Sequence, residues 1–243
     1  MKYTKQNIEK QRKVLSSDKV RKNSSVSLFL FKYVFIVSII LIVAGLGLGV
    51  GFVRGILKTT PQITKNSVHS KGYITTIYDN KGQTIKTLSN HDSNRIYTPL
   101  SSIPKDLQHA FIAIEDERFY DHNGIDIQGM LRAGVKFVTS GFKTTQGAST
   151  ITQQLLKNNV FDFMSEHGML EKIERKLQEQ YLAVKLEDIM SKDEILESYL
   201  NTINLGQNTL GVQAAANRYF GKSISELDIS EAAVLAAITK SPT

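Results

Sequence analysis

The chain has 243 residues, which is enough for one domain of ordinary size with a sizeable hydrophobic core. It carries 30 Lys and Arg against 23 Asp and Glu, and the net charge of +7 lies entirely in residues 1–33, which hold nine basic and two acidic side chains. Because the remaining residues balance their charges, the basic composition does not indicate a nucleic-acid partner. The absence of Cys excludes disulfides and zinc-thiolate sites.

An uncharged apolar segment, residues 33–53, follows the basic tail. At 1.5 Å per residue, a helix of this length covers roughly 30 Å, about the hydrocarbon thickness of a bilayer. We therefore predict a single transmembrane helix. A cleavable signal peptide is the alternative, but its apolar core would be shorter and would end at a small-residue cleavage site. The Lys and Arg before the span predict that residues 1–32 form a cytoplasmic tail and that the rest lies outside.

Residues 54–99 are predicted to form a linker and a short β-hairpin, since β-branched and polar residues alternate on both sides of residues 79–82, Asp-Asn-Lys-Gly. From about residue 100 the apolar positions follow the helical period instead. Leu107, Phe111 and Ile114, for example, share one face of a helix behind Pro104.

Further helices are indicated by their starts and by their apolar faces. Thr150 with Gln153, and Ser191 with Glu194, have the spacing of capping boxes. Between them, one apolar face indicates a long helix over about residues 170–190, and residues 211–221 and 231–240 are typical of short helices rich in Ala. Residues 100–243 are therefore predicted to form a mainly α domain.

Three acidic residues, Glu115, Asp116 and Glu117, directly follow the apolar run of the first of these helices. Glu115 lies one position past the last apolar residue, so its side chain can leave the edge of the core and enter a cleft partly shielded from water. A carboxylate placed there could act as a general base or acid. The alternative is a solvated helix end, and the local pattern taken alone favours it, although a carboxylate is unfavourable near the negative end of the helix dipole.

Two further segments are ambiguous when each is taken alone. Gly147 and the small residues after it precede a capped helix, which is either an anion-binding geometry or an ordinary helix start. Arg175, Lys176 and Glu179 lie on about one turn of a helix, which is most often a surface network of ion pairs.

Together and in this order, the segments resemble the motifs of the peptidoglycan glycosyltransferases of glycosyltransferase family 51. The first motif, E-D-x-x-F-x-x-H-x-G, is matched by Glu115, Asp116, Phe119, His122 and Gly124. The second, G-x-S-T-x-x-Q-Q, is matched by Gly147, Ser149, Thr150, Gln153 and Gln154. The third, R-K-x-x-E, is matched by Arg175, Lys176 and Glu179. Residues 192–206 and 230–242 are similar to the fourth and fifth motifs.

The resemblance implies a lysozyme-like α fold that polymerises lipid II into β-1,4-linked glycan strands, with inversion at the sugar and release of undecaprenyl pyrophosphate. It implies Glu115 as the general base, and Glu179 as a second carboxylate that orients the acceptor or assists the leaving pyrophosphate, by analogy with glycosidases. The predicted substrate-binding residues are Asp116, Arg118, Phe119, Arg132, Gly147, Ser149, Thr150, Gln153, Gln154, Lys157, Arg175 and Lys176.

This sequence departs from the family pattern at three positions. Gln178 and Glu171 stand where relatives often have basic residues, and Asn204 replaces a frequent Tyr of the fourth motif. The first two departures weaken the assignment of a pyrophosphate site more than they weaken the assignment of Glu115 as the base. We expect no required cofactor. A divalent cation, Mg²⁺ or Mn²⁺, could supply charge near the pyrophosphate, although no ligand motif such as HExxH is present.

The expected partners follow from the same resemblance: lipid II, the growing glycan strand, the bacterial cell membrane, other cell-wall synthesis proteins, and moenomycin as an inhibitor. Residues 125–142 mix apolar and basic side chains and are predicted to touch the membrane, with an ordinary amphipathic core helix as the alternative.

The motifs of a penicillin-binding transpeptidase domain do not occur in a suitable context, and the sequence stops within the fifth motif. We therefore expect the N-terminal part of a class A penicillin-binding protein, or a shortened monofunctional transglycosylase. Two other functions stay open: a lytic enzyme that cleaves glycan, and a non-catalytic membrane scaffold of the cell-wall machinery.

Overall fold

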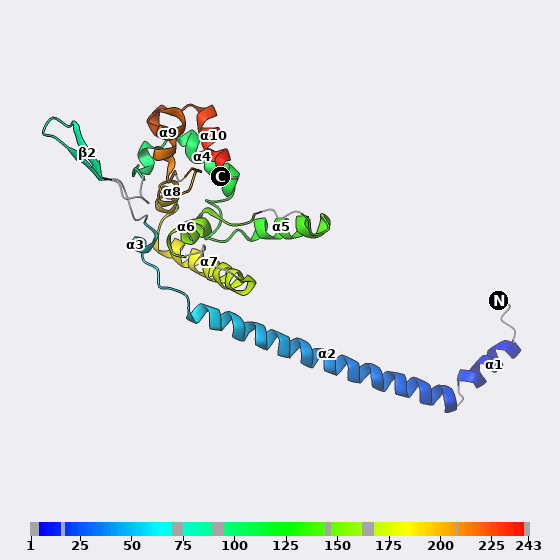
Figure 1. Ribbon diagram of the computed structural model, residues 1–243. Coiled ribbons are helices and arrows are strands. Elements are labelled where there is room, and N and C mark those ends of the chain that lie inside the picture. The colour runs from blue at the N-terminus through cyan, green and yellow to red at the C-terminus, as the bar shows by residue number, and fades with distance from the viewer. Residues whose placement is uncertain are drawn as a thin grey trace. The chain divides into compact units, whose positions relative to one another are not determined.

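The computed structural model describes residues 5–15, 18–69, 75–88, 95–143, 147–161, 168–207 and 209–240. The chain divides into two compact units, Met1–Lys58 and Thr59–Thr243. The first unit contains α1 (Lys5–Leu15) and α2 (Asp18–Lys58), which run from blue to cyan in Figure 1.

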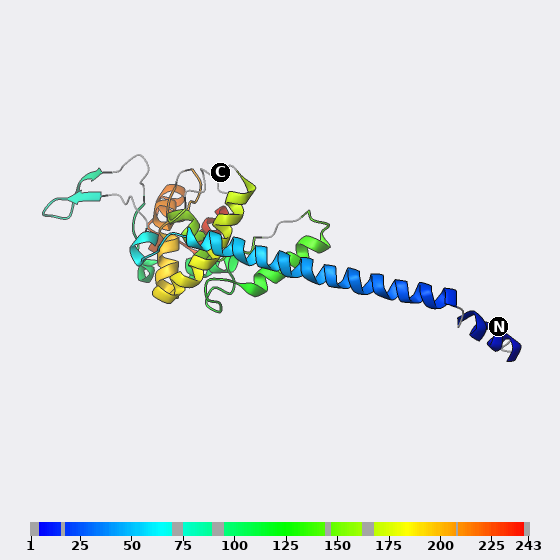
Figure 2. The ribbon, with the colours of Figure 1, turned by 90° about the horizontal axis from the view of Figure 1, so that it is seen from below.

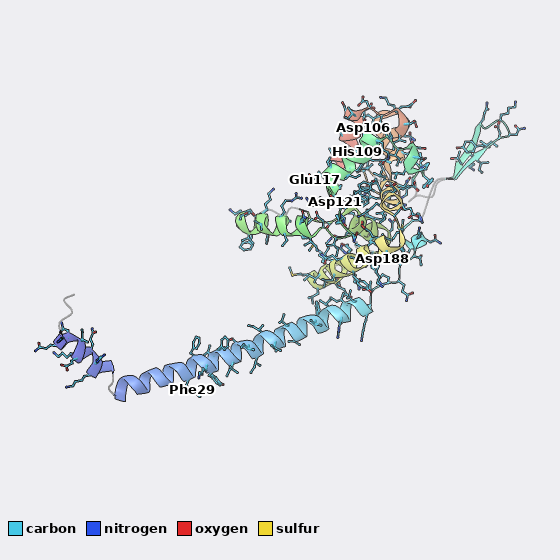
Figure 3. All side chains as sticks on the ribbon, turned by 180° about the vertical axis from the view of Figure 1, so that it is seen from behind. Phe29, Asp106, His109, Glu117, Asp121 and Asp188 are labelled. Carbon is cyan, nitrogen blue, oxygen red and sulfur yellow. The ribbon has the colours of Figure 1, made fainter. Side chains whose placement is uncertain are left out.

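One helix of the described residues is long and apolar enough to cross a membrane. It is the part of α2 from Phe29 to Lys58, which has 30 residues and a mean hydropathy of 2.7. Most of its side chains are exposed, and Ile56 near its end is buried; Phe29 projects from the helix in Figure 3. At 1.5 Å per residue this part is roughly 45 Å long, so it contains the whole predicted span of residues 33–53 with length to spare.

Residues 54–58, the first of the predicted linker, continue α2, and the helix ends at Lys58. The end has a local cause, because Pro61 follows three residues later and the residue before a proline is disfavoured in helical geometry. The short helix α3 (Lys65–Val68) follows in the same predicted linker.

The predicted hairpin follows α3 in the second unit and is confirmed. Strands β1 (Thr75–Tyr78) and β2 (Thr84–Leu88) pair antiparallel, with a register irregularity between Ile77 and Tyr78. The turn is held by Asp79, whose Oδ1 accepts the backbone N–H groups of Lys81 at 2.8 Å and Gln83 at 2.7 Å.

The rest of the second unit is helical, as predicted. The elements, in chain order, are η1 (Leu100–Ser102), α4 (Lys105–Glu115), α5 (Ile127–Thr139), α6 (Ile151–Asn159), α7 (Met169–Ile189), α8 (Lys192–Leu200), α9 (Val212–Phe220), η3 (Ile224–Glu226) and α10 (Ile229–Ile238). α4 packs against α10, and α6 packs against both α7 and α8. α5 extends away from the other helices in Figures 1 and 2.

The helix starts agree with the capping signals of the sequence. The Thr150 side chain accepts the N–H of Gln153 at the start of α6, and Ser191 and Glu194 form a complete capping box at the start of α8. Each such cap satisfies backbone donors that the first turn of a helix leaves without partners.

The core lies where these helices meet. Leu107 and Phe111 of α4 are fully buried, as their spacing predicts, and the Phe111 ring meets the Tyr199 ring of α8 edge to face at 6.4 Å between centroids. Burial of one such side chain is worth about 1.5–3 kcal/mol. Lys105, Asp106 and His109 of α4 are exposed, and Figure 3 labels Asp106 and His109.

Candidate active site

A cavity of about 520 Å³ opens beside the C-terminal end of α4. Its walls come from α4 and the residues after it, from α5, from the segment that leads into α6, and from Lys240 just beyond α10. Seven of the predicted site residues line it: Glu115, Asp116, Arg132, Gly147, Ser149, Thr150 and Gln154.

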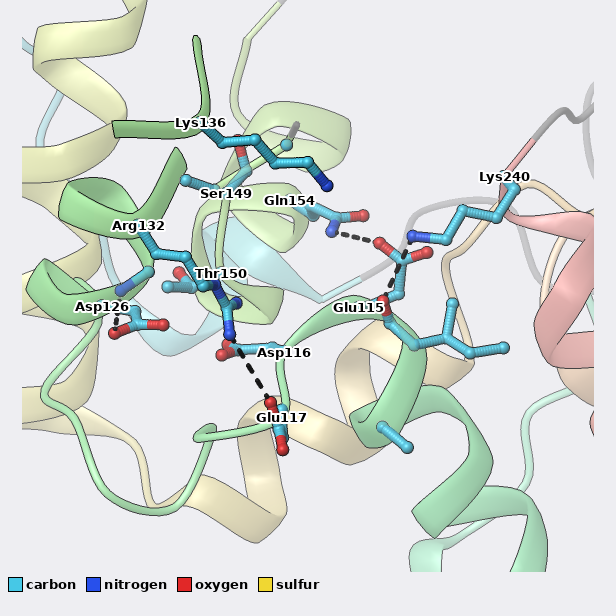
Figure 4. Close-up of a pocket in the computed structure, with 15 residues that line it drawn as sticks. Glu115, Asp116, Glu117, Asp126, Arg132, Lys136, Ser149, Thr150, Gln154 and Lys240 are labelled. Atoms are coloured by element: carbon cyan, nitrogen blue, oxygen red, sulfur yellow. Dashed lines mark hydrogen bonds and ion pairs between the residues drawn. The ribbon is translucent and has the colours of Figure 1, made fainter. Parts of the chain in front are cut away.

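Glu115 is the last residue of α4, and its half-buried side chain is held by two donors. The Gln154 amide donates from Nε2 to Oε2 of the carboxylate at 2.8 Å, and the Thr239 hydroxyl donates to Oε1. Lys240 donates to the backbone carbonyl of Ile114 at 3.2 Å, so its ammonium also lies beside this helix end. Figure 4 shows the Gln154 amide directed at the Glu115 carboxylate, with Lys240 on the other side.

Asp116 points into the protein, where it connects two of the motifs. Only 6% of the residue is exposed, and its Oδ2 accepts the backbone N–H of Ile151, the first residue of α6, at 3.0 Å. His122 Nε2 contacts the same carboxylate, at 2.9 Å from Oδ1. Asp116 therefore satisfies a donor at a helix N-terminus and fixes the turn after α4 against α6.

The turn after α4 approaches α7 so closely that only glycine fits at position 124. Gly124 has a φ of +82°, and a Cβ at this position would lie 2.6 Å from the carbonyl carbon and oxygen of Ala183. Its own carbonyl accepts the Thr150 hydroxyl at 2.8 Å. This glycine therefore lets the first motif pack against the helix that carries the third, while Thr150 joins it to the second.

Three cationic side chains line the cavity: Arg132, Lys136 and Lys240. Arg132 forms a long ion pair with Glu117, at 3.8 Å between Nη1 and Oε2, and Figure 4 shows this pair at the edge of the cavity. Within the described part of the chain, the Lys136 ammonium has no hydrogen-bond or ion-pair partner. The cavity thus presents three cations beside the carboxylates of Glu115, Asp116, Glu117 and Asp126, which line it too.

Glu179 does not line the cavity. Its side chain is 1% exposed and is held by two cations, the Arg175 guanidinium at Oε1 and the Lys176 ammonium at 2.9 Å from Oε2. Lys176 also donates to Ser149 Oγ at 2.7 Å and to Gln153 Oε1 at 3.3 Å. The third motif is therefore a buried ion-pair network that reaches the cavity through Ser149, and its cations neutralise Glu179.

Three predicted substrate-binding residues lie elsewhere. Phe119 is fully buried, with the Lys192 ammonium 4.5 Å from its ring centroid, so the ring is a core side chain that cannot touch a substrate in this structure. Arg118 pairs with Asp126 and lines a separate cavity of about 430 Å³. Lys157 lies in the last turn of α6 and does not line the main cavity.

The Arg118–Asp126 pair has a structural task. Asp126 caps α5 by accepting the N–H of Gly129 at 2.9 Å, while its carboxylate binds Arg118. Burial alone would raise the pKa of Asp126, but the hydrogen bonds from Arg118 and Gly129 outweigh it and hold that pKa below its usual value. The hydrogen bond to Asp126 is the main cause that raises the pKa of Arg118.

No group of three or more His, Asp or Glu side chains among the described residues could hold a metal ion. The divalent cation considered above stays a prediction. The charged side chains that line the cavity are of both signs: Glu115, Asp116, Glu117 and Asp126, and Arg132, Lys136 and Lys240.

Sequence reasoning missed three contributors to the site, Lys136, Thr239 and Lys240, and it gave Tyr199 only a packing role behind the cleft. The Tyr199 hydroxyl donates to Gln154 Oε1 at 3.3 Å, behind the contact between Gln154 and Glu115. Thr239 and Lys240 belong to the segment similar to the fifth motif, and Lys136 to the segment predicted to touch the membrane. Polar residues at the ends of those segments were the signal that could have indicated them.

Comparison with known proteins agrees with the five motifs. Residues 81–243 match the transglycosylase family. The chain is 42% identical over 197 residues to penicillin-binding protein 1A of Clostridium novyi (strain NT), and the match covers 79% of this chain and 22% of that protein. It is 42% identical over 195 residues to penicillin-binding protein 1A of Clostridium perfringens (strain 13 / Type A), covering 79% of this chain and 28% of that protein.

A third relative is penicillin-binding protein 1A of Escherichia coli (strain K12). It is 44% identical over 166 residues, and the match covers 68% of this chain and 18% of that protein. The chain therefore spans between 18% and 28% of the length of these relatives. Because the family match extends over more than half of the sequence, this chain belongs to the transglycosylase family.

Proposed function

We propose that this chain polymerises lipid II into β-1,4-linked glycan strands and releases undecaprenyl pyrophosphate, with Glu115 as the general base. The observation that carries the proposal is the place of Glu115 in a cavity that also presents Arg132, Lys136 and Lys240. Glycosyl transfer to a hydroxyl requires a group that takes the proton of that hydroxyl. It also requires positive charge near the leaving anion. Membership of the transglycosylase family supports the same reaction.

The acceptor is the 4-hydroxyl of the GlcNAc of lipid II, and the donor is the growing strand, whose terminal MurNAc carries an α-linked undecaprenyl pyrophosphate. Glu115 takes the hydroxyl proton while the acceptor oxygen bonds to C1 of MurNAc. The bond between C1 and the pyrophosphate oxygen breaks, and its electron pair leaves with the pyrophosphate. Attack from the opposite face inverts the α linkage to β.

The hydrogen bonds of Glu115 are compatible with this role. Gln154 and Thr239 each occupy one oxygen of the carboxylate. A carboxylate oxygen has two lone pairs, so each oxygen keeps one that can receive the proton. The two donors hold the carboxylate in one orientation, which limits the reorganisation needed when the acceptor binds.

The departing pyrophosphate needs cations. The exposed ends of Arg132 and Lys136 on α5, and of Lys240 after α10, are the side chains that we assign to it. Lys176 adds to them indirectly, because its ammonium donates to Ser149 at the cavity wall. In this scheme Glu179 helps the leaving group by fixing Arg175 and Lys176, and it does not contact the substrate.

The substrate is anchored in a lipid bilayer, and α5 is suited to meet that surface. Ile127, Leu131, Val135 and Val138 are between 61% and 68% exposed, and their spacing places them on one face of the helix. Because the chain has no Trp, a Leu131→Trp variant reports this contact directly. Its fluorescence in proteoliposomes should be quenched by brominated lipids, whereas a Val234→Trp control on α10 should not be quenched.

The basic tail before α2 leads us to assign a cytoplasmic N-terminus and an extracytoplasmic catalytic domain. Because the sequence has no Cys, a single introduced cysteine supplies the only thiol that a maleimide can label. A membrane-impermeant maleimide applied to intact cells should label Asp106→Cys and leave Asn7→Cys unlabelled. The opposite labelling would reverse the orientation.

The central experiment incubates the full chain, in detergent micelles, with lipid II. We expect glycan polymer and undecaprenyl pyrophosphate from the parent, none from Glu115→Gln, and parental activity from Asp106→Asn, an exposed carboxylate on the same helix. Moenomycin should block the parent. Soluble muropeptides released from finished peptidoglycan would support a lytic enzyme instead, and polymer formation by Glu115→Gln would exclude Glu115 as the base.

A further inference from the structure

We propose that Tyr199 is a positioning residue for Glu115 and acts through Gln154, an inference that rests on the proposed role of Glu115 as the base. The three side chains form a short chain of hydrogen bonds. The Tyr199 hydroxyl donates to Gln154 Oε1 at 3.3 Å, and Gln154 Nε2 donates to Glu115 Oε2 at 2.8 Å. They come from α8, α6 and α4, so the chain joins three helices.

The direction of these hydrogen bonds follows from the chemistry of the end groups. An ionised Glu115 can only accept, so Gln154 must turn its NH₂ group toward it. The amide oxygen of Gln154 then faces Tyr199, and only the hydroxyl hydrogen of Tyr199 can satisfy it. Tyr199 thereby satisfies the far end of the amide and holds it in the orientation that gives Glu115 a donor.

Tyr199 is suited to this task because it can neither move nor lose its proton near neutral pH. The residue is fully buried, and its ring packs edge to face on Phe111. Burial, together with the negative charges of Glu115 and Asp116, raises the pKa of the phenol well above its usual value. The hydroxyl therefore stays a donor throughout the pH range of catalysis.

Without this hydroxyl, the partly buried amide oxygen of Gln154 loses its donor, and the amide is no longer held on the side away from Glu115. If the amide turns over, its oxygen faces the Glu115 carboxylate, and two acceptors then oppose each other. The ionised form of Glu115 becomes less favourable, and the carboxylate is released from one of its two donors. Thr239 remains as the other donor, and the charged groups that line the same cavity are Asp116, Glu117, Asp126, Arg132, Lys136 and Lys240.

The test is Tyr199→Phe in the full chain, with lipid II as substrate. We expect kcat to fall by a factor on the order of 10 to 100, the range that misplacement of a reacting group produces. KM should change little, and the acid limb of the pH profile of kcat/KM should move to higher pH. The matched control is Tyr219→Phe, which removes a hydroxyl that donates to the Leu205 carbonyl at 2.7 Å, outside the cavity, and should leave rate and profile unchanged.

A double-mutant cycle separates positioning from a general packing effect. If Tyr199 acts through Gln154, then Tyr199→Phe should have no further effect on kcat in a Gln154→Leu background. The melting temperature of each variant shows whether it is folded. Parental kinetics for Tyr199→Phe would overturn the inference, and so would full additivity of the effects of Tyr199→Phe and Gln154→Leu on kcat. In either case, an inactive Glu115→Gln would still support the proposed function. An active Glu115→Gln would instead refute the proposed function.

Discussion

The buried network around Glu179 gives the sharpest stability prediction. Glu179→Gln keeps the shape of the side chain but removes the charge that neutralises Arg175 and Lys176, which are 17% and 40% exposed. Removal of one partner from a buried ion pair typically costs about 3–5 kcal/mol. Water can reach Lys176 and relieve part of this loss, so we place the expected destabilisation at the lower end, about 3 kcal/mol.

The assay is thermal melting of the full chain in detergent, together with lipid II polymerisation at a temperature where the variant is folded. For a domain of this size each kcal/mol shifts the melting temperature by about 2–4 °C, so the expected drop is roughly 6–12 °C. Because the network reaches the cavity only through Ser149, kcat should fall by about tenfold or less, below the 10²–10⁴ typical of a lost general acid or base.

The control is Glu187→Gln on the same helix. Glu187 is also buried, but it pairs with a single cation, Lys192, at 2.7 Å and lies outside the cavity. The Glu187→Gln variant should have a smaller drop in melting temperature than Glu179→Gln, and the rate of the folded enzyme should be unchanged. If Glu179→Gln melted like the parent yet lost nearly all activity, Glu179 would be a reacting group and the structural assignment would be wrong.

Three other predictions test the surroundings of the site. Gly124→Ala should destabilise the domain by about 3 kcal/mol or more, because it combines a positive φ with a backbone clash. The control is Gly221→Ala, which also has a positive φ but has open space around it. It should cost only about 1 kcal/mol in the same melting assay. A hydrogen bond from Lys65, followed by others from Ser191, lowers the pKa of Glu194 to about 2 from 4.5. The stability that this carboxylate contributes is therefore complete above pH 4.5 and is lost as the pH falls toward 2, so the small melting difference between Glu194→Gln and the parent should vanish over that range. Finally, Thr239→Val should lower kcat while Thr239→Ser preserves it, and equal rates for the two variants would remove Thr239 from the support of the base.

Local signals in the sequence were sufficient for most of the fold. The apolar period placed Leu107 and Phe111 in the core, and the capping residues placed the starts of α6 and α8, because each of these features depends on neighbours within one or two helical turns. The helix α2 extends past the predicted span to include residues 54–58, where Arg54 and Lys58 flank the apolar Ile56 and Leu57.

The site was only partly predictable, because adjacency in a motif does not fix where a side chain points. The chain turns after α4, so Glu115 faces the cavity, Asp116 turns inward to α6, and Phe119 enters the core. Partners distant in sequence could not be derived at all. Thr239 lies 124 residues from Glu115, and Tyr199 lies 45 residues from Gln154.

The two carboxylates show how the domain separates function from stability. Glu115 ends α4, where the negative end of the helix dipole disfavours its charge, and donors from α6 and the end of α10 compensate for it. Glu179 lies in the interior, where two cations neutralise it completely. Neutralising Glu115 therefore removes an unfavourable charge, whereas neutralising Glu179 removes the charge that Arg175 and Lys176 share. It follows that Glu115→Gln should abolish turnover in a protein whose melting temperature stays near that of the parent. Glu179→Gln should lower the melting temperature clearly while it lowers kcat only modestly.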